Sequence, residues 1–318
     1  MPAPGSDLDR GKRREALRGR CVGVWDLRRS RPGVGNTLIF VEALHLESPA
    51  VDVAFVGERS WVGGGIRTLL GGLEGIEKLR WADSLEELKR RTGADRLWPD
   101  VSRLDPQGRI DFDYDSLLYL QKRSDDGRSL PRLSVRREHR RRALALLRRW
   151  VLPARPVVVH LKNAGGGSGE SDADFAAWTE FFDLFGGEPE LKFVLIGNEP
   201  LPEGLLRKRN VTATRSWGCG FLEDLACIQA AYAFMGMASG PAAMAMFNEA
   251  PYAIVKNPEH HPETMERELG TSDRFRFADP MQRILRIRES APILRSELDR
   301  MLSFRDRRAW EAQLARLE

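Results

Sequence analysis

Short apolar runs alternate with amphipathic segments along almost the whole chain. In the first half, apolar strand patterns lie at 21–27, 51–57 and near 78–81, and helical patterns at 36–46 and 84–93. Parallel strands that are covered on both faces have continuous apolar runs, and amphipathic helices connect them. The pattern therefore predicts an α/β lobe with a mainly parallel sheet.

The second half repeats this alternation with sharper boundaries. It predicts strands at 155–163, 192–199, 232–239 and 251–258, and helices at 172–185, 221–231 and 242–250. A long Arg-rich helix ends at Trp150, and Pro153 and Pro156 then break the chain. The predicted organisation is a basic tail (1–20), an N-terminal Rossmann-like lobe (21–152), a C-terminal Rossmann-like lobe (153–278) and two C-terminal helices (279–318) split near Pro292.

Residues 110–115, IDFDYD, alternate polar and apolar positions with a period of two. Such alternation is typical of a half-exposed strand, whose carboxylates lie on the solvent face. Asp111, Asp113 and Asp115 have the spacing of a metal-binding Asp-x-Asp pair, but we interpret them as this solvent face.

Composition and charge restrict the class of protein. The 318 residues are 42% hydrophobic and 30% charged, as in soluble globular proteins. No apolar run reaches the roughly 18 residues that a membrane helix needs, and the N-terminal segment lacks the apolar centre of a signal peptide. Three cysteines without CxxC spacing suit a reducing compartment. We therefore expect a cytoplasmic protein without zinc.

Arginines account for most of the net charge of +4, and they gather in the N-terminal tail and in 136–149. In 136–149 they are scattered around the helix, without interleaved aromatic residues, so a solvated charged surface is favoured over a nucleic-acid site. Nucleic acid is not an expected partner. A peripheral contact with an anionic membrane stays open.

Polar residues lie at the ends of three predicted strands of the second half. They are Lys162 and Asn163, Asn198 and Glu199, and the turn Ser239, Gly240 and Pro241. Because ligands of open α/β sheets bind beyond the carboxyl ends of the strands, these residues are expected to converge. Backbone N–H groups at a helix start suit a phosphate, although an ordinary Ser cap with a first-turn proline explains the same turn structurally.

A glycine loop separates the first predicted strand from the first predicted helix. Gly33 and Gly35 precede Asn36, and Arg29 lies in the same loop. Leu38 occupies the third glycine position of a GxGxxG fingerprint, so the match is incomplete. The glycines suit a tight turn, and the arginine suits an anionic ligand.

Taken in order, these motifs resemble those of the GT-B glycosyltransferases, and most of all their heptosyltransferase-like members. GVGNTLIFVEALHL (33–46) is similar to their glycine loop and first helix, and SGPAAMAMFNEAP (239–251) to a late GP-containing element. The strand with VVVH (157–160) resembles the first strand of their donor lobe. Asn36 stands where that family commonly has an acidic residue.

The resemblance implies that a nucleotide-sugar donor binds the C-terminal lobe, with its diphosphate at Lys162 and at 239–241. An acceptor, a glycan of the cell envelope or a lipid-linked molecule, would bind the N-terminal lobe, at the inner face of the membrane. Neither a cofactor nor an obligatory metal ion is implied. Glu199 or Asn198 would receive hydrogen bonds from a hydroxyl group or the base. Trp217 or Phe221 would stack on the base, although aromatic residues at the head of an apolar helix more often pack in the core.

Inversion at the sugar carbon requires a base, and its identity is not evident from the sequence. Asp26, at the end of the first strand, and Glu42, on the following helix, are weak candidates. His160 lies in an apolar strand and is interpreted as a core histidine, whereas His260 and His261 follow a strand and could line the cleft.

Two alternatives stay open. A nonhydrolysing sugar-nucleotide epimerase shares the architecture, but it needs acidic residues facing the sugar, and Glu199 is the only good one. A non-catalytic protein of the same fold that binds anions, nucleic acid or a membrane surface is the other alternative.

Overall fold

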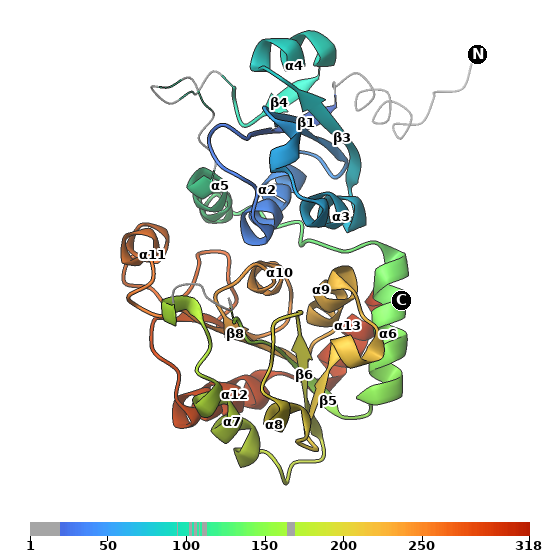
Figure 1. Ribbon diagram of the computed structural model, residues 1–318, viewed down its shortest axis with the longest axis vertical. Helices are drawn as coiled ribbons and strands as arrows, with labels where there is room; N and C mark the ends of the chain where they lie inside the picture. The colour runs from blue at the N-terminus through green and yellow to red at the C-terminus, as the bar shows by residue number, and fades with distance from the viewer. Residues whose placement is uncertain are drawn as a thin grey trace, which may run out of the picture.

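The computed structural model describes residues 20–318 apart from 94, 102–103, 105–106, 108, 110–112 and 164–168. The described chain forms two α/β lobes, one above the other in Figure 1. Within it, no helix is both long and apolar enough to cross a membrane. The predicted fold class, two Rossmann-like lobes with parallel sheets, is confirmed.

The first lobe is built on a parallel sheet in the order β3-β2-β1-β4. Its strands are β1 (Cys21–Asp26), β2 (Val51–Val56), β3 (Ile76–Ala82) and β4 (Arg96–Trp98), and its helices are α2 (Val34–Glu47), α3 (Gly64–Gly72), α4 (Leu85–Thr92) and α5 (Asp113–Asp125). Every residue of β1 and β2 is buried, as their continuous apolar runs predict. In α4, Ser84 Oγ accepts the N–H of Glu87, and Gly93, at φ 57°, ends the helix.

The second lobe is built on a parallel sheet in the order β10-β9-β8-β5-β6-β7. Its strands are β5 (Arg155–His160), β6 (Leu191–Ile196), β7 (Val211–Ala213), β8 (Ala233–Met237), β9 (Tyr252–Val255) and β10 (Gln282–Leu285). The helices of this half are α6 (Arg137–Trp150), α7 (Phe175–Leu184), α8 (Glu203–Leu206), α9 (Phe221–Gln229), α10 (Ala242–Met246), α11 (Pro262–Leu269), α12 (Ala291–Phe304) and α13 (Arg307–Leu317).

Helices of the two lobes contact each other directly. In Figure 1, α2, α3 and α5 of the upper lobe face α10, α9 and α11 of the lower lobe, and each of these pairs is in contact. A Cβ on Gly72 of α3 would lie 2.3 Å from Leu222 Cδ1 of α9, so a larger residue there would displace Leu222. One hydrophobic cluster continues through this interface.

The structure corrects several predicted elements. The strand predicted at 110–115 is wrong for residues 113–115, because they begin the helix α5 (Asp113–Asp125). Residues 110–112 lie outside the described residues. The tail predicted to be only helical begins with the edge strand β10, and Pro292 lies in the first turn of α12 rather than between two helices. A short polar-rich edge strand gives little periodic signal, and proline is tolerated in a first helical turn.

Helix α6 lies beside the second lobe. The predicted lobe boundary at 152 assigns it to the first lobe, whereas it packs on α9 and α13 (Figure 1). Its apolar face, with Ala143, Leu144 and Leu147 buried, covers these helices, and its arginines lie around the remaining surface. Sequence position alone does not indicate which lobe an amphipathic helix covers.

Candidate functional site

A cavity of about 540 Å³ lies between the lobes. The first lobe contributes the start of α2, with Gly33 to Asn36, and Leu117 of α5. The second lobe contributes the carboxyl ends of β5, β8 and β9 together with α11. The cavity thus lies where open parallel sheets bind their ligands, at the ends of the strands.

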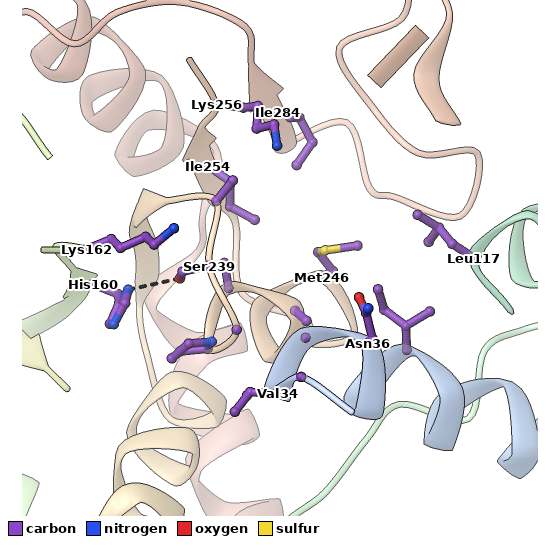
Figure 2. A pocket seen from close by; sticks show the side chains of 18 of the residues that line it. Val34, Asn36, Leu117, His160, Lys162, Ser239, Met246, Ile254, Lys256 and Ile284 are labelled. Atoms are coloured by element: carbon purple, nitrogen blue, oxygen red, sulfur yellow. Dashed lines mark hydrogen bonds between the residues drawn. The ribbon is translucent and has the colours of Figure 1, made fainter. Parts of the chain in front are cut away.

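Three side chains of the second lobe form a hydrogen-bonded chain at this cavity. His160 Nδ1 is 2.9 Å from Ser239 Oγ, as the dashed line in Figure 2 shows, and His160 Nε2 is 3.1 Å from Glu199 Oε1. Burial raises the pKa of Glu199, but the hydrogen bond and the charge of His160, with backbone N–H groups, outweigh it and leave that pKa below its ordinary value. The imidazole is fixed on both sides, and Ser239 and Glu199 border the cavity.

This chain explains two of the sequence predictions. His160 is 2% exposed with partners on both ring nitrogens, so it is the satisfied buried histidine that its apolar strand predicts. Ser239 does not cap the next helix: the cap position is Pro241, and α10 has only five residues. A helix this short contributes little dipole at the turn. The polar character of the turn therefore comes from the serine hydroxyl and its histidine.

Two lysines supply positive charge to the cavity. Lys162 follows β5, and its Nζ donates to Ser171 Oγ at 2.7 Å. Lys256 follows β9, is 9% exposed, and has its Nζ 3.0 Å from His260 Nδ1. Figure 2 shows both side-chain nitrogens directed into the space that Asn36 faces from α2. Burial lowers the pKa of Lys256, and the charge of Glu268 opposes this.

Lys256 and Glu268 are the charged groups of the described cavity lining that the sequence analysis did not identify. Lys256 lies near the end of the strand predicted at 251–258 and directly follows β9, so the rule that identified Lys162 applies to it equally. Glu268 lies on α11, a helix for which no periodic signal was recognised. Burial raises the pKa of Glu268 to about 7, although the charges of Lys256 and Arg267 lower it. Its carboxyl therefore exchanges its proton near neutral pH.

Comparison with known proteins gives likeness in structure only. No protein-family model and no curated protein matches the chain by sequence. Among solved structures, a glycosyl transferase family 9 protein from Veillonella parvula has 12% identity and a TM-score of 0.50, over 91% of this chain and 90% of that one. The Escherichia coli heptosyltransferase WaaC, solved with ADP, has 11% identity and a TM-score of 0.52, over 89% and 98%. Escherichia coli ADP-heptose heptosyltransferase II has 11% identity and a TM-score of 0.53, over 89% and 98%.

This chain has the two-lobed GT-B fold. The match extends over nine-tenths of the chain, so both lobes and their mutual arrangement belong to the likeness. In the GT-B arrangement, the cavity of this chain is the cleft between the lobes.

Several predicted site residues border the GT-B cleft. They are Gly33, Gly35 and Asn36 of the first lobe, and Lys162, Glu199, Ser239, Gly240, Pro241 and His261 of the second. The two glycine segments meet across the lobes, because a Cβ on Gly35 would lie 3.6 Å from Gly240 Cα. A Cβ on Gly240 would lie 2.6 Å from Val34 Cβ, so Gly240 is needed for this close approach, whereas a Cβ on Gly35 would make an ordinary contact.

Other predicted residues lie outside the cavity lining. Asn163 Nδ2 donates to the carbonyl of Pro200 at 3.1 Å, Asn198 is exposed, and Arg29 of the first loop does not border the cavity. Trp217 and Phe221 pack against the hydrophobic cluster that joins the lobes. Their position does not support the prediction that they stack on a nucleobase.

The two weak candidates for a catalytic base also lie outside the cavity lining. Asp26 is fully buried, and Arg28 donates to both of its carboxylate oxygens, at 2.8 and 2.6 Å. Glu42 is fully buried rather than on the helix surface, and its Oε1 accepts the N–H of Arg132 at 2.8 Å. Burial raises the pKa of Glu42 to about 7, against the lowering by backbone N–H groups of Arg132 and Leu133. Both carboxylates hold the fold of the first lobe.

Proposed function

We propose that the chain is a glycosyltransferase that moves a sugar from a nucleotide-sugar donor to a hydroxyl acceptor in the interlobe cavity. The observation that carries this proposal is the presence of two lysines and the Ser239–His160–Glu199 chain on the donor-side wall of a GT-B cleft. The likeness to glycosyltransferase structures supports the class of reaction.

Lys162 and Lys256 are proposed to hold the donor diphosphate. Cations in a partly buried site interact more strongly with an anion than they do in water, and negative charge grows on the diphosphate as the sugar leaves. Their charge thus stabilises the leaving group without requiring a metal ion or a cofactor. The heptosyltransferase WaaC has been solved with ADP and with ADP-2-deoxy-2-fluoro heptose, which supports a nucleotide-sugar as the donor class.

The acceptor is proposed to bind on the side of the cavity formed by α2 and α5. Asn36 and Leu117 offer a polar and an apolar contact there, which suits a glycan or a lipid-linked glycan of the cell envelope. The corresponding location of the enzyme is the cytoplasm, with peripheral contact at the inner face of the membrane. Salt-sensitive binding to anionic vesicles tests that contact.

Nucleotide binding is the first prediction. The purified protein is expected to show a higher melting temperature with one of UDP, GDP, ADP, TDP or CMP, or with the corresponding nucleotide-sugar. A ligand at 100 times its Kd stabilises the folded state by about 2.7 kcal/mol. Lys162→Ala and Ser239→Ala are expected to abolish the shift, while the exposed surface variant Lys89→Ala keeps it. If none of these ligands raises the melting temperature, the proposal is contradicted. If the shift is unchanged in both cavity variants, the donor does not bind at Lys162 and Ser239.

An epimerase stays the alternative because two acidic residues, Glu199 and Glu268, are among the described residues that line the cavity, whereas the sequence indicated Glu199 alone. The two reactions differ in their products. A transferase releases the nucleoside diphosphate, whereas an epimerase converts the sugar and keeps it attached. Chromatography of the nucleotide products distinguishes them, and a bound donor with neither product indicates a non-catalytic binder.

A further inference from the structure

We propose that Glu268 is the general base that deprotonates the acceptor hydroxyl. The inference rests on the proposed transferase function and extends it to a catalytic residue. It follows from the position of this side chain in the cavity, from the way α11 is attached to the first lobe, and from the charges around it.

The carboxylates available to a substrate are few. Among the described residues, Glu199 and Glu268 are the acidic side chains that line the cavity. Glu199 is engaged by His160, which keeps it ionised and oriented toward the imidazole. Asp26 and Glu42 are fully buried away from the lining, and position 36 at the start of α2 is an asparagine. An uncharged amide has no basic site at neutral pH. Glu268 is therefore the cavity carboxylate that can accept a proton from a substrate.

Helix α11 is attached to the first lobe where Glu268 lies. Gln121 of α5 is 3% exposed, and its Nε2 donates to the carbonyl of Glu268 at 2.9 Å. Its Oε1 accepts the N–H of Arg276 at 3.2 Å, so one buried amide joins α5 to the last turn of α11 and to the segment that follows it. Leu117, one turn earlier on α5, lines the cavity. Glu268 is thus held at the wall shared with the first lobe, where the acceptor is proposed to bind.

The surroundings adjust Glu268 for proton transfer near neutral pH. Burial raises the pKa of its carboxyl to about 7, opposed by Lys256 at the end of β9 and by Arg267, its neighbour on α11. The other charged or titratable groups in the described cavity lining are His160, Lys162, Glu199 and His261. Glu266, Arg274 and Arg276 border a second cavity that Glu268 also lines. His260 contacts Lys256, and burial and the charge of Lys256 lower the pKa of His260 to about 4. A general base is most effective when its pKa is close to the working pH.

In the proposed step, the hydroxyl proton of the acceptor moves to a carboxylate oxygen of Glu268. The acceptor oxygen that loses this proton forms a bond to the anomeric carbon, and the bond from that carbon to the donor phosphate oxygen breaks, with its electron pair going to the phosphate. The nucleoside diphosphate leaves against Lys162 and Lys256, and Glu268 then returns the proton to water. No oxidant or further reactant is needed.

The test is the variant Glu268→Gln, which keeps the shape of the side chain and removes the base. With UDP-, GDP-, ADP- and TDP-glucose as donors and water as the acceptor, release of the nucleoside diphosphate is expected to fall by about 10²–10⁴-fold, the usual range for loss of a general base. Nucleotide-induced stabilisation is expected to stay unchanged. Glu268→Asp is expected to retain part of the rate. Glu266→Gln, on the exposed side of the same helix, serves as the matched control and keeps the rate.

The pH profile separates a base from a structural residue. The wild-type rate is expected to rise with pH through about 7, because Glu268 accepts a proton only when ionised. In Lys256→Met, loss of the cation that lowers the pKa of Glu268 is expected to move this limb to higher pH. In Glu268→Gln the limb is expected to disappear.

The outcomes distinguish this inference from the proposed function. If Glu268→Gln releases nucleoside diphosphate at the wild-type rate, with the wild-type pH limb, Glu268 is not the base although the transferase stands. If the wild-type protein binds a nucleotide-sugar and releases no nucleoside diphosphate at any pH, the base is overturned while the donor site stands. If it binds no nucleotide-sugar, the proposed function fails and this inference fails with it.

Discussion

Gly236→Ala is expected to destabilise the second lobe by about 3 kcal/mol or more and to abolish nucleotide binding. Gly236 has φ +151°, a conformation that side chains disfavour, and a Cβ there would lie 2.4 Å from the carbonyl oxygen of His160. It pairs with His160 in the centre of the six-stranded sheet. The clash is with backbone, so the two strands must separate or shift, and the histidine contact with Ser239 is lost.

Thermal unfolding with and without the stabilising nucleotide measures this effect. At about 2–4 °C per kcal/mol for a cooperatively unfolding lobe of about 150–250 residues, the melting temperature is expected to fall by about 6–12 °C. Gly204→Ala is the matched control, because Gly204 is an exposed residue of α8 and a Cβ there would meet nothing within 4 Å. Its melting temperature is expected to stay the same or rise slightly. Equal melting temperatures of the Gly236→Ala and Gly204→Ala variants would contradict the close approach of β5 and β8.

Glu42→Gln is expected to remove a fall in stability between about pH 5 and 7. The ordinary pKa of this carboxyl, 4.5, is raised by burial to about 7, so between these values the folded state binds a proton that the unfolded state has released. The contribution of Glu42 to the free energy of unfolding therefore decreases as pH rises through this window and is flat above it, in addition to the fall that the buried Glu268 contributes. At about 1.4 kcal/mol per pKa unit, the decrease is roughly 3 kcal/mol.

Chemical unfolding at pH 5, 6, 7 and 8 measures this difference. In the variant, the side-chain oxygen of glutamine can still accept the N–H of Arg132. The side-chain NH₂ group replaces Oε2 of Glu42, which has no hydrogen-bond partner among the described residues, so this NH₂ group is buried without an acceptor. The variant is thus expected to be equal to or less stable than the wild type at pH 5 and relatively more stable at pH 8. Glu77→Gln, on the exposed face of β3, is expected to leave the wild-type slope unchanged. A Glu42→Gln protein with the wild-type slope refutes ionisation of a buried Glu42 as its source.

The local elements of this chain follow from its sequence because burial on both faces of a parallel sheet imposes long apolar runs. β1, β2 and β5 were predicted in this way, and α4 from its Ser84 and Gly93 boundaries. The strand ends also identified Lys162, Glu199 and Ser239 as neighbours of one cavity. Where the local pattern is ambiguous, the prediction failed: IDFDYD has the period of a strand, yet its last three residues begin α5.

What the sequence determined, then, is the two-lobed α/β class and the polar residues at the strand ends, since both depend on short-range patterns of burial and on the common direction of parallel strands. The tertiary structure decided which of these residues contact one another. Ser239 meets His160 across 79 positions, and Glu199 meets it across 39. It also separated Asp26 and Glu42 from the cavity and brought Glu268 to it on α11, attached to α5 by Gln121 across 147 positions. Contacts of this kind depend on how helices pack between lobes, and no local periodicity encodes that packing.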